Sequence, residues 1–347
     1  MTVEHHRLTQ LLPELEEMRA LAEQKGDLVK LRTLTTVEVQ GQQLPIYALT
    51  MGSEDPNAPA IGLFGGVHGV ERIGTEVVMA YMHSLIEGLS WSPGLQEQLK
   101  KIHIVFMPMV NPGGIINKTR CNPKGVDLMR NAPIDASDNV PFMLGGQRIS
   151  RVLPWYRGQK DAPMEIEAQA LCQLVEEHLL TRPFSLALDC HSGYGRDDYL
   201  WLPYAGSKKP FPHLAEVHAL KNIFDRTYPN HTYYKIEPQS LHYTTHGDLW
   251  DYLHINSLKE NNGIFLPLTL EMGSWRWIKK NPRQLFRFAS LFNPVLPHRH
   301  QRILRRHLIL IEFLFRAVQG YQHWLPNKEH YQQLTEIARQ HWYVNDK

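Results

Sequence analysis

The chain has 347 residues, of which 43% are hydrophobic and 21% are charged. This composition excludes a disordered chain and is sufficient for a sizeable buried core, in one large domain or two small ones. The formal net charge of +2 gives no reason to expect a nucleic acid or a membrane as partner, and we predict neither.

The cysteines and the N-terminal composition indicate the cellular compartment. The chain contains three cysteines, Cys121, Cys172 and Cys190, and an odd number argues against a disulfide scaffold. Residues 1–25 are polar and lack the apolar segment of a secretory signal. The most apolar run, residues 308–318, is much shorter than the ~20 residues that a membrane-spanning helix needs. We therefore expect a soluble, cytoplasmic protein.

The first expected element is an amphipathic helix, because apolar side chains between Leu8 and Leu21 recur at helical spacing. A hairpin is predicted next, with strands at residues 36–40 and 44–50 and a turn at Gly41. From residue 60 onwards, short apolar runs typical of buried strands alternate with helical patterns. The strands are predicted at residues 60–64, 102–109, 186–190 and 264–270, and the helices at residues 72–86, 164–180, 213–227 and 301–318.

Continuous apolar strands separated by helices are typical of an α/β fold with a largely parallel, buried sheet. We predict a single domain whose mixed, mostly parallel twisted sheet carries helices on both faces. The main domain is expected at residues 29–320, with an N-terminal helical extension at 1–28 and a C-terminal helical tail packed on the domain at 321–347. The turn-rich segment 131–160 is long enough to be functional, but the sequence does not say whether it covers a site.

Four polar residues, His68, Asn111, His191 and Glu271, follow four of the predicted strands. In an open α/β sheet, ligands bind beyond the carboxyl ends of the strands. The predicted topology therefore brings these residues to one edge of the sheet, although they are far apart in the sequence.

A metal site is predicted at this edge. His68 and Glu71 are three residues apart just after one strand, and His191 follows another. Two histidines and one carboxylate leave a fourth position open, which is the ligand pattern of catalytic zinc. Zinc lowers the pKa of a coordinated water and polarises a carbonyl group, and Glu271 is placed to accept the proton. Each motif is weak by itself, since an isolated His-x-x-Glu also occurs in ordinary surface turns, so the prediction depends on their joint placement.

The segments around these positions resemble the motifs of the zinc carboxypeptidase family, in the same order, from about residue 31 to residue 314. The stretch between Asn111 and Arg120 is short, as in compact microbial members. The matching segments are GGVHGVE at 65–71, NPGG at 111–114, Arg120 with GVDLMRN at 125–131, DCHS at 189–192 and LTLE at 268–271, with a looser match of YRG at 156–158 and MEIE at 164–167.

The resemblance implies a metallohydrolase with one zinc ion per chain, held by His68, Glu71 and His191. Glu271 would act as the general base and pass the proton to the leaving amine. Arg120 would stabilise the oxyanion of the tetrahedral intermediate.

The resemblance also implies substrate-binding residues. Arg130 would bind the terminal carboxylate of the substrate, because a planar guanidinium suits bidentate pairing. Asp127 resembles the carboxylate that orients a zinc-binding histidine. Asn111 is expected to contact the substrate, as is Tyr243, which resembles the flap tyrosine of the family. The alternative for Tyr243 is a loop tyrosine that packs its ring.

Two further positions bear on substrate recognition. Met129 stands where the family has an asparagine that shares the terminal carboxylate with the arginine, and methionine cannot donate a hydrogen bond. The clamp around Arg130 is thus halved. Trp250 stands about where some members read the leaving side chain.

We predict a metallopeptidase that cleaves an amide bond near a free carboxylate, in a peptide or a peptidoglycan fragment. One alternative is an aspartoacylase-like deacylase of N-acyl amino acids, and another is a zinc-binding or peptide-binding module that has lost catalysis.

We interpret the cluster of Arg299, Arg302, Arg305 and Arg306 as the solvated face of a helix. The sequence leaves the oligomeric state open.

Overall fold

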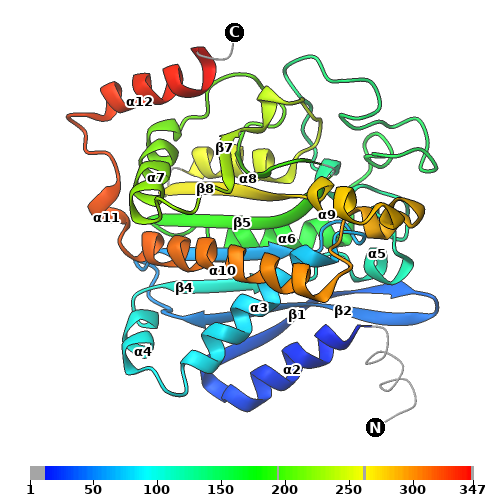
Figure 1. Cartoon of the computed structure of the whole chain (residues 1–347), viewed down its shortest axis with the longest axis horizontal. Helices are drawn as coiled ribbons and strands as arrows, with labels where there is room; N and C mark the ends of the chain where they lie inside the picture. Colours follow the sequence, from blue (N-terminus) through cyan, green and yellow to red (C-terminus); the bar gives the residue numbers. More distant parts are fainter. Residues whose placement is uncertain (1–11, 194, 261–262, 345–347) are drawn as a thin grey trace.

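The computed structural model describes residues 12–193, 195–260 and 263–344. An eight-stranded sheet in the order β1-β2-β4-β3-β5-β8-β6-β7 runs through the molecule (Figure 1). Neighbouring strands are parallel from β4 through β3 and β5 to β8, and β6 is parallel to β7, whereas the β1–β2, β2–β4 and β6–β8 pairs are antiparallel. The strands are β1 (Val29–Val39), β2 (Gln42–Gly52), β3 (Ala60–Gly65), β4 (His103–Met107), β5 (Phe184–Gly193), β6 (Asp198–Leu202), β7 (Tyr234–Pro238) and β8 (Ile264–Gly273).

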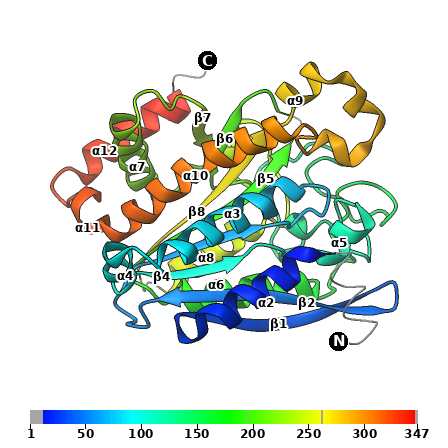
Figure 2. The ribbon, with the colours of Figure 1, turned by 60° about the horizontal axis from the view of Figure 1, so that its bottom comes forward.

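Helices cover both faces of the sheet (Figures 1 and 2). Helices α3 and α10 pack together on one face with α2 beside them, and α6 and α8 pack on the other. Every residue of β3 and β4 is buried, which is why these strands read as continuous apolar runs. The predicted fold class is confirmed. The helices are α2 (Pro13–Lys25), α3 (Arg72–Gly88), α4 (Pro93–Leu99), α5 (Pro112–Asn117), α6 (Ile166–His178), α7 (Leu214–Thr227), α8 (Leu249–Glu260), α9 (Trp275–Lys280), α10 (Pro297–Gln319), α11 (Tyr321–Trp324) and α12 (Tyr331–Arg339).

Several elements differ from the prediction. Strands β6 and β7 and helix α8 had not been predicted, because the two strands are only five residues long and α8 interleaves polar and apolar residues. The N-terminal hairpin is longer than predicted, since β1 and β2 have 11 residues each. Leu8 and Leu11 of the predicted first helix lie outside the described residues.

The C-terminal region is divided into short helices. A helical tail had been expected at residues 321–347, and its described part contains α11, α12 and, after Arg339, a π-helical turn at Gln340–Val344. The Nε1 group of Trp342 in that turn donates to the backbone oxygen of Ile236, 2.7 Å away, and thereby ties the tail to β7. In the described part of the chain, no helix is both long and apolar enough to cross a bilayer.

Two glycines allow the chain after β3 to pass very close to its neighbours. A Cβ atom on Gly74, in the first turn of α3, would lie 2.0 Å from the backbone oxygen of Cys190 in β5. A Cβ atom on Gly69 would lie 2.0 Å from the backbone carbon of Gly114 in α5. Only glycine fits such an approach. The contacts bring the start of α3 directly beside β5 and the turn after β3 directly beside α5.

This packing generates a prediction for Gly74. Replacement by alanine should push α3 away from β5 and lower the free energy of unfolding by about 3 kcal/mol, because the added methyl group meets backbone rather than a movable side chain. Urea unfolding measures the change. Gly94→Ala in α4 is the matched control, because a Cβ atom there meets nothing within 4 Å. Equal stability of the two variants would contradict the proposed close packing.

Candidate metal centre and active site

Three of the predicted ligands meet at one edge of the sheet. His68 follows β3, Glu71 directly precedes α3, and His191 lies on β5. His68 Nδ1 is 2.9 Å from Glu71 Oε1 and 3.2 Å from His191 Nδ1, and His191 Nδ1 is 3.0 Å from Glu71 Oε2. All three residues are buried, and each offers a ligand atom within 4.8 Å of the other two. Two imidazole nitrogens and one carboxylate oxygen at this separation fit zinc.

Each histidine of this cluster is held by a carboxylate on its far side. His68 Nε2 lies 3.1 Å from Asp127 Oδ1, and His191 Nε2 lies 2.6 Å from Asp189 Oδ2. A carboxylate that accepts the Nε2–H proton leaves Nδ1 free for a metal. The structure thus places Asp127 at the distance that its predicted role requires. Asp189 had not been predicted as a site residue, although alternation along β5 puts it on the same face as His191.

Trp250 supports this second carboxylate. Its Nε1 group donates to Asp189 Oδ2 over 2.9 Å, and its ring is only 2% exposed. The indole packs edge-on against Phe64 of β3, with ring centroids 5.1 Å apart. Trp250 therefore supports Asp189 from within the core, and it does not line the large cavity that His68 and Glu71 border.

Two arginines converge on Asp127. Arg120 Nε lies 3.0 Å and Arg130 Nη1 lies 3.2 Å from Asp127 Oδ2. Burial by itself would raise the pKa of Asp127, but these two guanidinium groups outweigh it and hold the pKa well below its usual value. Asp127 therefore stays ionised at neutral pH, as an acceptor for His68.

Glu71 is held in the same network. Its Oε1 atom accepts from Arg120 Nη1 over 3.0 Å, and its Oε2 atom accepts from the backbone N–H of Ser192 over 3.1 Å. Burial opposes ionisation, but His68 and His191 outweigh it and lower the pKa of Glu71. A carboxylate that is ionised and fixed at both oxygens is prepared to bind a cation.

Glu271 lies beside the ligand cluster. It is on β8, in register with His191 on β5, and its side chain reaches the same cavity. A Cβ atom on Gly193 would lie 2.0 Å from Glu271 Oε1, so the glycine makes room for this carboxyl group. Burial, together with the charge of Glu71, raises the pKa of Glu271 to about 8. A pKa near neutrality suits a group that takes up and releases a proton.

A cavity of about 980 Å³ contains the site. Of the predicted site residues it is lined by His68, Glu71, Arg120, Arg130, Tyr243 and Glu271. Segment 131–160 forms part of the wall through Leu144 and residues 151–155, so this segment borders the site. Tyr243 is partly exposed at the wall and meets Trp201 edge-on, with ring centroids 6.2 Å apart.

The structure does not support a substrate contact for Asn111. This residue is fully buried and caps helix α5, where its Oδ1 atom accepts from the backbone N–H of Gly114 over 2.8 Å. Its Nδ2 group donates to the backbone oxygen of Val67 over 3.2 Å. The oxygen and the nitrogen of the Asn111 amide are thus both used in hydrogen bonds that join α5 to the turn before His68.

The two neighbours Met129 and Arg130 have different environments. Met129 is part of the hydrophobic core and does not line the cavity. Arg130 is 4% exposed, lines the cavity, and donates from Nε to the backbone oxygen of Leu144 over 3.2 Å. Arg130 is thus the only one of the two that is available to a substrate.

Comparison with known proteins places these motifs in a family. A family model described as zinc carboxypeptidase matches residues 15–274. Carboxypeptidase E of Caenorhabditis elegans is 26% identical over 171 residues, which are 45% of this chain and 35% of that protein. Carboxypeptidase SOL1 of Arabidopsis thaliana is 32% identical over 75 residues, which are 22% of this chain and 15% of that protein. The chain therefore matches about a third or less of the length of these curated relatives.

Solved structures share the fold at low sequence identity. Thrombin-activatable fibrinolysis inhibitor superposes with a TM-score of 0.66 at 18% identity, over 89% of this chain and 74% of that chain. Carboxypeptidase A of Helicoverpa armigera superposes with a TM-score of 0.64 at 16% identity, over 87% of this chain and 71% of that chain.

The bond between Trp250 and Asp189 generates a prediction. Trp250→Phe keeps an aromatic ring but removes the hydrogen bond, so Asp189 should hold His191 less firmly and zinc affinity should fall about 10-fold. Competition with a zinc chelator measures the dissociation constant. Trp91→Phe, at a position that is 76% exposed, serves as the control. An unchanged zinc affinity in Trp250→Phe would show that this bond does not act on the metal centre.

Proposed function

The chain belongs to the zinc carboxypeptidase family, and from this membership we propose that it cleaves the amide bond next to a free carboxylate in a peptide or a peptidoglycan fragment. The observation that carries the proposal is the convergence, in one cavity, of the His68–Glu71–His191 cluster with a carboxyl base and two arginines. Each of these groups corresponds to a separate requirement of amide hydrolysis.

The resident metal that we propose is one zinc ion bound by Nδ1 of His68, Nδ1 of His191 and the carboxylate of Glu71. Zinc supplies Lewis-acid chemistry, which polarises a carbonyl group and makes water a stronger acid. Asp127 and Asp189 hold the two imidazoles in the tautomer that presents Nδ1 to the centre. Arg120, through its bond to Glu71, keeps that carboxylate turned towards the histidines.

The proton transfers are assigned to Glu271. Its carboxylate removes a proton from the attacking water, and its carboxylic acid then gives the proton to the nitrogen of the leaving amine. A cation in the neighbouring cluster lowers the pKa of Glu271 and favours the ionised form that the first step requires. Arg120 is fixed by bonds to Asp127 and Glu71 at the cavity wall, where its charge stabilises the oxyanion.

Substrate binding is assigned to Arg130 and Tyr243. The guanidinium group of Arg130 is anchored by Asp127 and by the Leu144 carbonyl, so it is ready to receive a terminal carboxylate without reorganising. Because Met129 is turned into the core, Arg130 acts without help from its neighbour. The cavity volume of about 980 Å³ favours a peptide over the small N-acyl amino acid of an aspartoacylase-like enzyme.

The base assignment can be tested by replacing Glu271. Glu271→Gln keeps the shape of the side chain but cannot accept the proton, so kcat should fall roughly 100-fold or more while zinc stays bound. Turnover of a peptide mixture, followed by mass spectrometry, and the zinc content of the purified protein are measured together. Chelation of zinc should abolish turnover in the wild type and zinc addition should restore it. A Glu271→Gln variant with full turnover would exclude this residue as the base.

The role of Arg130 can be tested with matched substrates. A peptide with a free C-terminal carboxylate should be cleaved at least 10-fold more efficiently than the same peptide with a C-terminal amide. Arg130→Lys keeps the positive charge but loses the planar fork, so kcat/KM for the free acid should fall while that for the amide changes little. If the variant loses the same factor on both peptides, Arg130 does not bind the terminal carboxylate.

A further inference from the structure

Two segments at the mouth of the cavity are rich in cations and lack carboxylates. The first rim segment, residues 139–160, contains four Lys or Arg residues, and the second, residues 272–292, contains five. Neither contains any of the 35 Asp and Glu residues of the chain. One of these cations, Arg157, is buried and paired with Asp135 over 2.7 Å, so it adds no charge to the rim. The remaining cations still give a basic rim to a protein whose net charge is only +2.

Both rim segments lie at the same end of the molecule, next to the active site. Figures 1 and 2 show the loop after α5 and the segment that includes α9 on the same side in both views. The first segment contributes residues 151–155 to the cavity wall, and the second contributes Phe288 and Phe292. The rim is thus continuous with the proposed substrate site.

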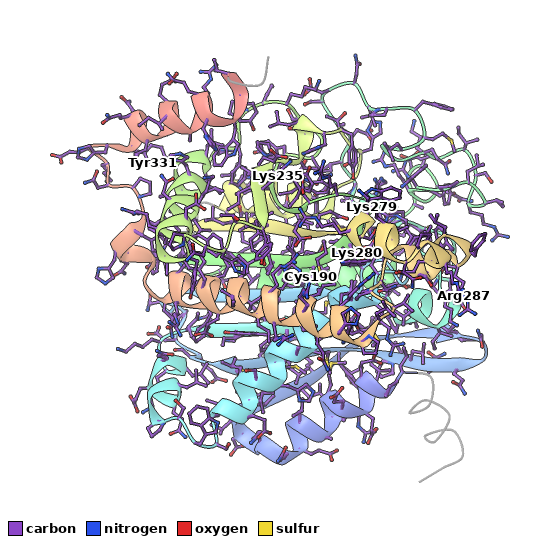
Figure 3. The ribbon with its side chains drawn as sticks, in the orientation of Figure 1. Cys190, Lys235, Lys279, Lys280, Arg287 and Tyr331 are labelled. Carbon is purple, nitrogen blue, oxygen red and sulfur yellow. The ribbon has the colours of Figure 1, made fainter. Side chains whose placement is uncertain are left out.

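Most cations of the second rim segment are unpaired. Arg276 is neutralised by Asp197, with Nη2 and Oδ1 2.6 Å apart. Lys279, Lys280, Arg283 and Arg287 are exposed, and none of them has an ion-pair partner in the part of the chain that the structure describes. Figure 3 shows Lys279 and Lys280 near each other and Arg287 farther towards the right edge, whereas Tyr331 lies on the left side.

Large apolar side chains accompany these charges. Phe286 is 88% exposed and Phe288 is 59% exposed in the second rim segment, and Phe142 and Val152 are 83% and 85% exposed in the first. Exposed apolar groups that gather beside a cavity mark a binding surface. The partner must therefore carry negative charge and also offer apolar contacts.

We propose that the rim binds an acidic, extended segment of the polypeptide substrate, on the part of the chain that remains outside the cavity. This inference rests on the proposed peptidase function. A chain whose end reaches the metal centre has to leave over the rim, since Val152 and Phe288 are at once rim and cavity wall. A flat lipid surface would reach only the tips of the two segments, whereas a chain lying between them contacts the unpaired cations and the phenyl rings together.

The attraction between the rim cations and an acidic substrate segment should weaken as the salt concentration rises. The cations are exposed, so their attraction for carboxylates of the substrate is screened over about 10 Å at 0.1 M salt. Binding of an acidic segment should therefore weaken steeply as the salt concentration rises, whereas binding of the peptide end inside the cavity should change less.

The experiment compares two fluorescent peptides that have the same last four residues but carry six Glu or six Gln residues before them. Zinc-loaded Glu271→Gln protein is titrated into each, so that affinity is measured without cleavage. We expect the Glu peptide to bind at least 10-fold more tightly in 50 mM salt and the difference to vanish in 500 mM salt. The double variant Arg283→Gln/Arg287→Gln, made in the same background, should lose most of the difference.

Matched controls separate the possible outcomes. Lys328→Gln/Arg339→Gln removes the same charge near the opposite end of the molecule and should keep the preference (Figure 1). Equal affinity for both peptides overturns the inference, and so does tight binding to phosphatidylglycerol vesicles without any preference for the Glu peptide. Wild-type turnover of a four-residue peptide tests the proposed function separately. If this peptide is cleaved but the Glu and Gln peptides bind equally well, the binding of an acidic segment is contradicted and the peptidase function is not.

Discussion

The site depends on one buried carboxylate, that of Asp127. It is completely buried, and it accepts hydrogen bonds from His68, Arg120 and Arg130 at once. A single charge therefore sets the tautomer of a proposed metal ligand and fixes the two arginines to which we assign the oxyanion and the terminal carboxylate. Its backbone N–H also donates to the Tyr156 carbonyl over 2.8 Å, which ties the same point to segment 131–160.

The sheet supplies the rest of the arrangement. The parallel strands β3, β5 and β8 end at one edge, and helix α3 begins immediately after Glu71. Close backbone packing at Gly69 and Gly74 accompanies the approach of His68, Glu71 and His191, whose candidate ligand atoms lie within 4.8 Å of one another. Rigid backbone contacts, rather than long flexible side chains, thus determine the geometry of the metal centre.

Much of this arrangement could be predicted from the sequence, because buried parallel strands are apolar over most of their length. His68 follows such a strand, and His191 and Glu271 lie near the carboxyl ends of two others. The other features of the site depend on contacts between residues that are far apart in the sequence, and a local sequence pattern does not predict such contacts. Asp189 and Trp250 are 61 residues apart and are joined only by the tertiary fold. Asn111 follows a strand as the ligands do, but its amide is consumed by capping α5. The basic rim is not evident from the net charge, because its cations are balanced by acidic residues elsewhere in the chain.

The register of β5 and β8 has a consequence for how this protein can change over evolutionary time. His191 and Glu271 are partners in adjacent parallel strands, so their side chains emerge on the same face at the same height. Inserting or deleting one residue in either strand would turn one of them to the opposite face. The proposed metal ligand and the proposed base therefore cannot be shifted independently of each other within these two strands.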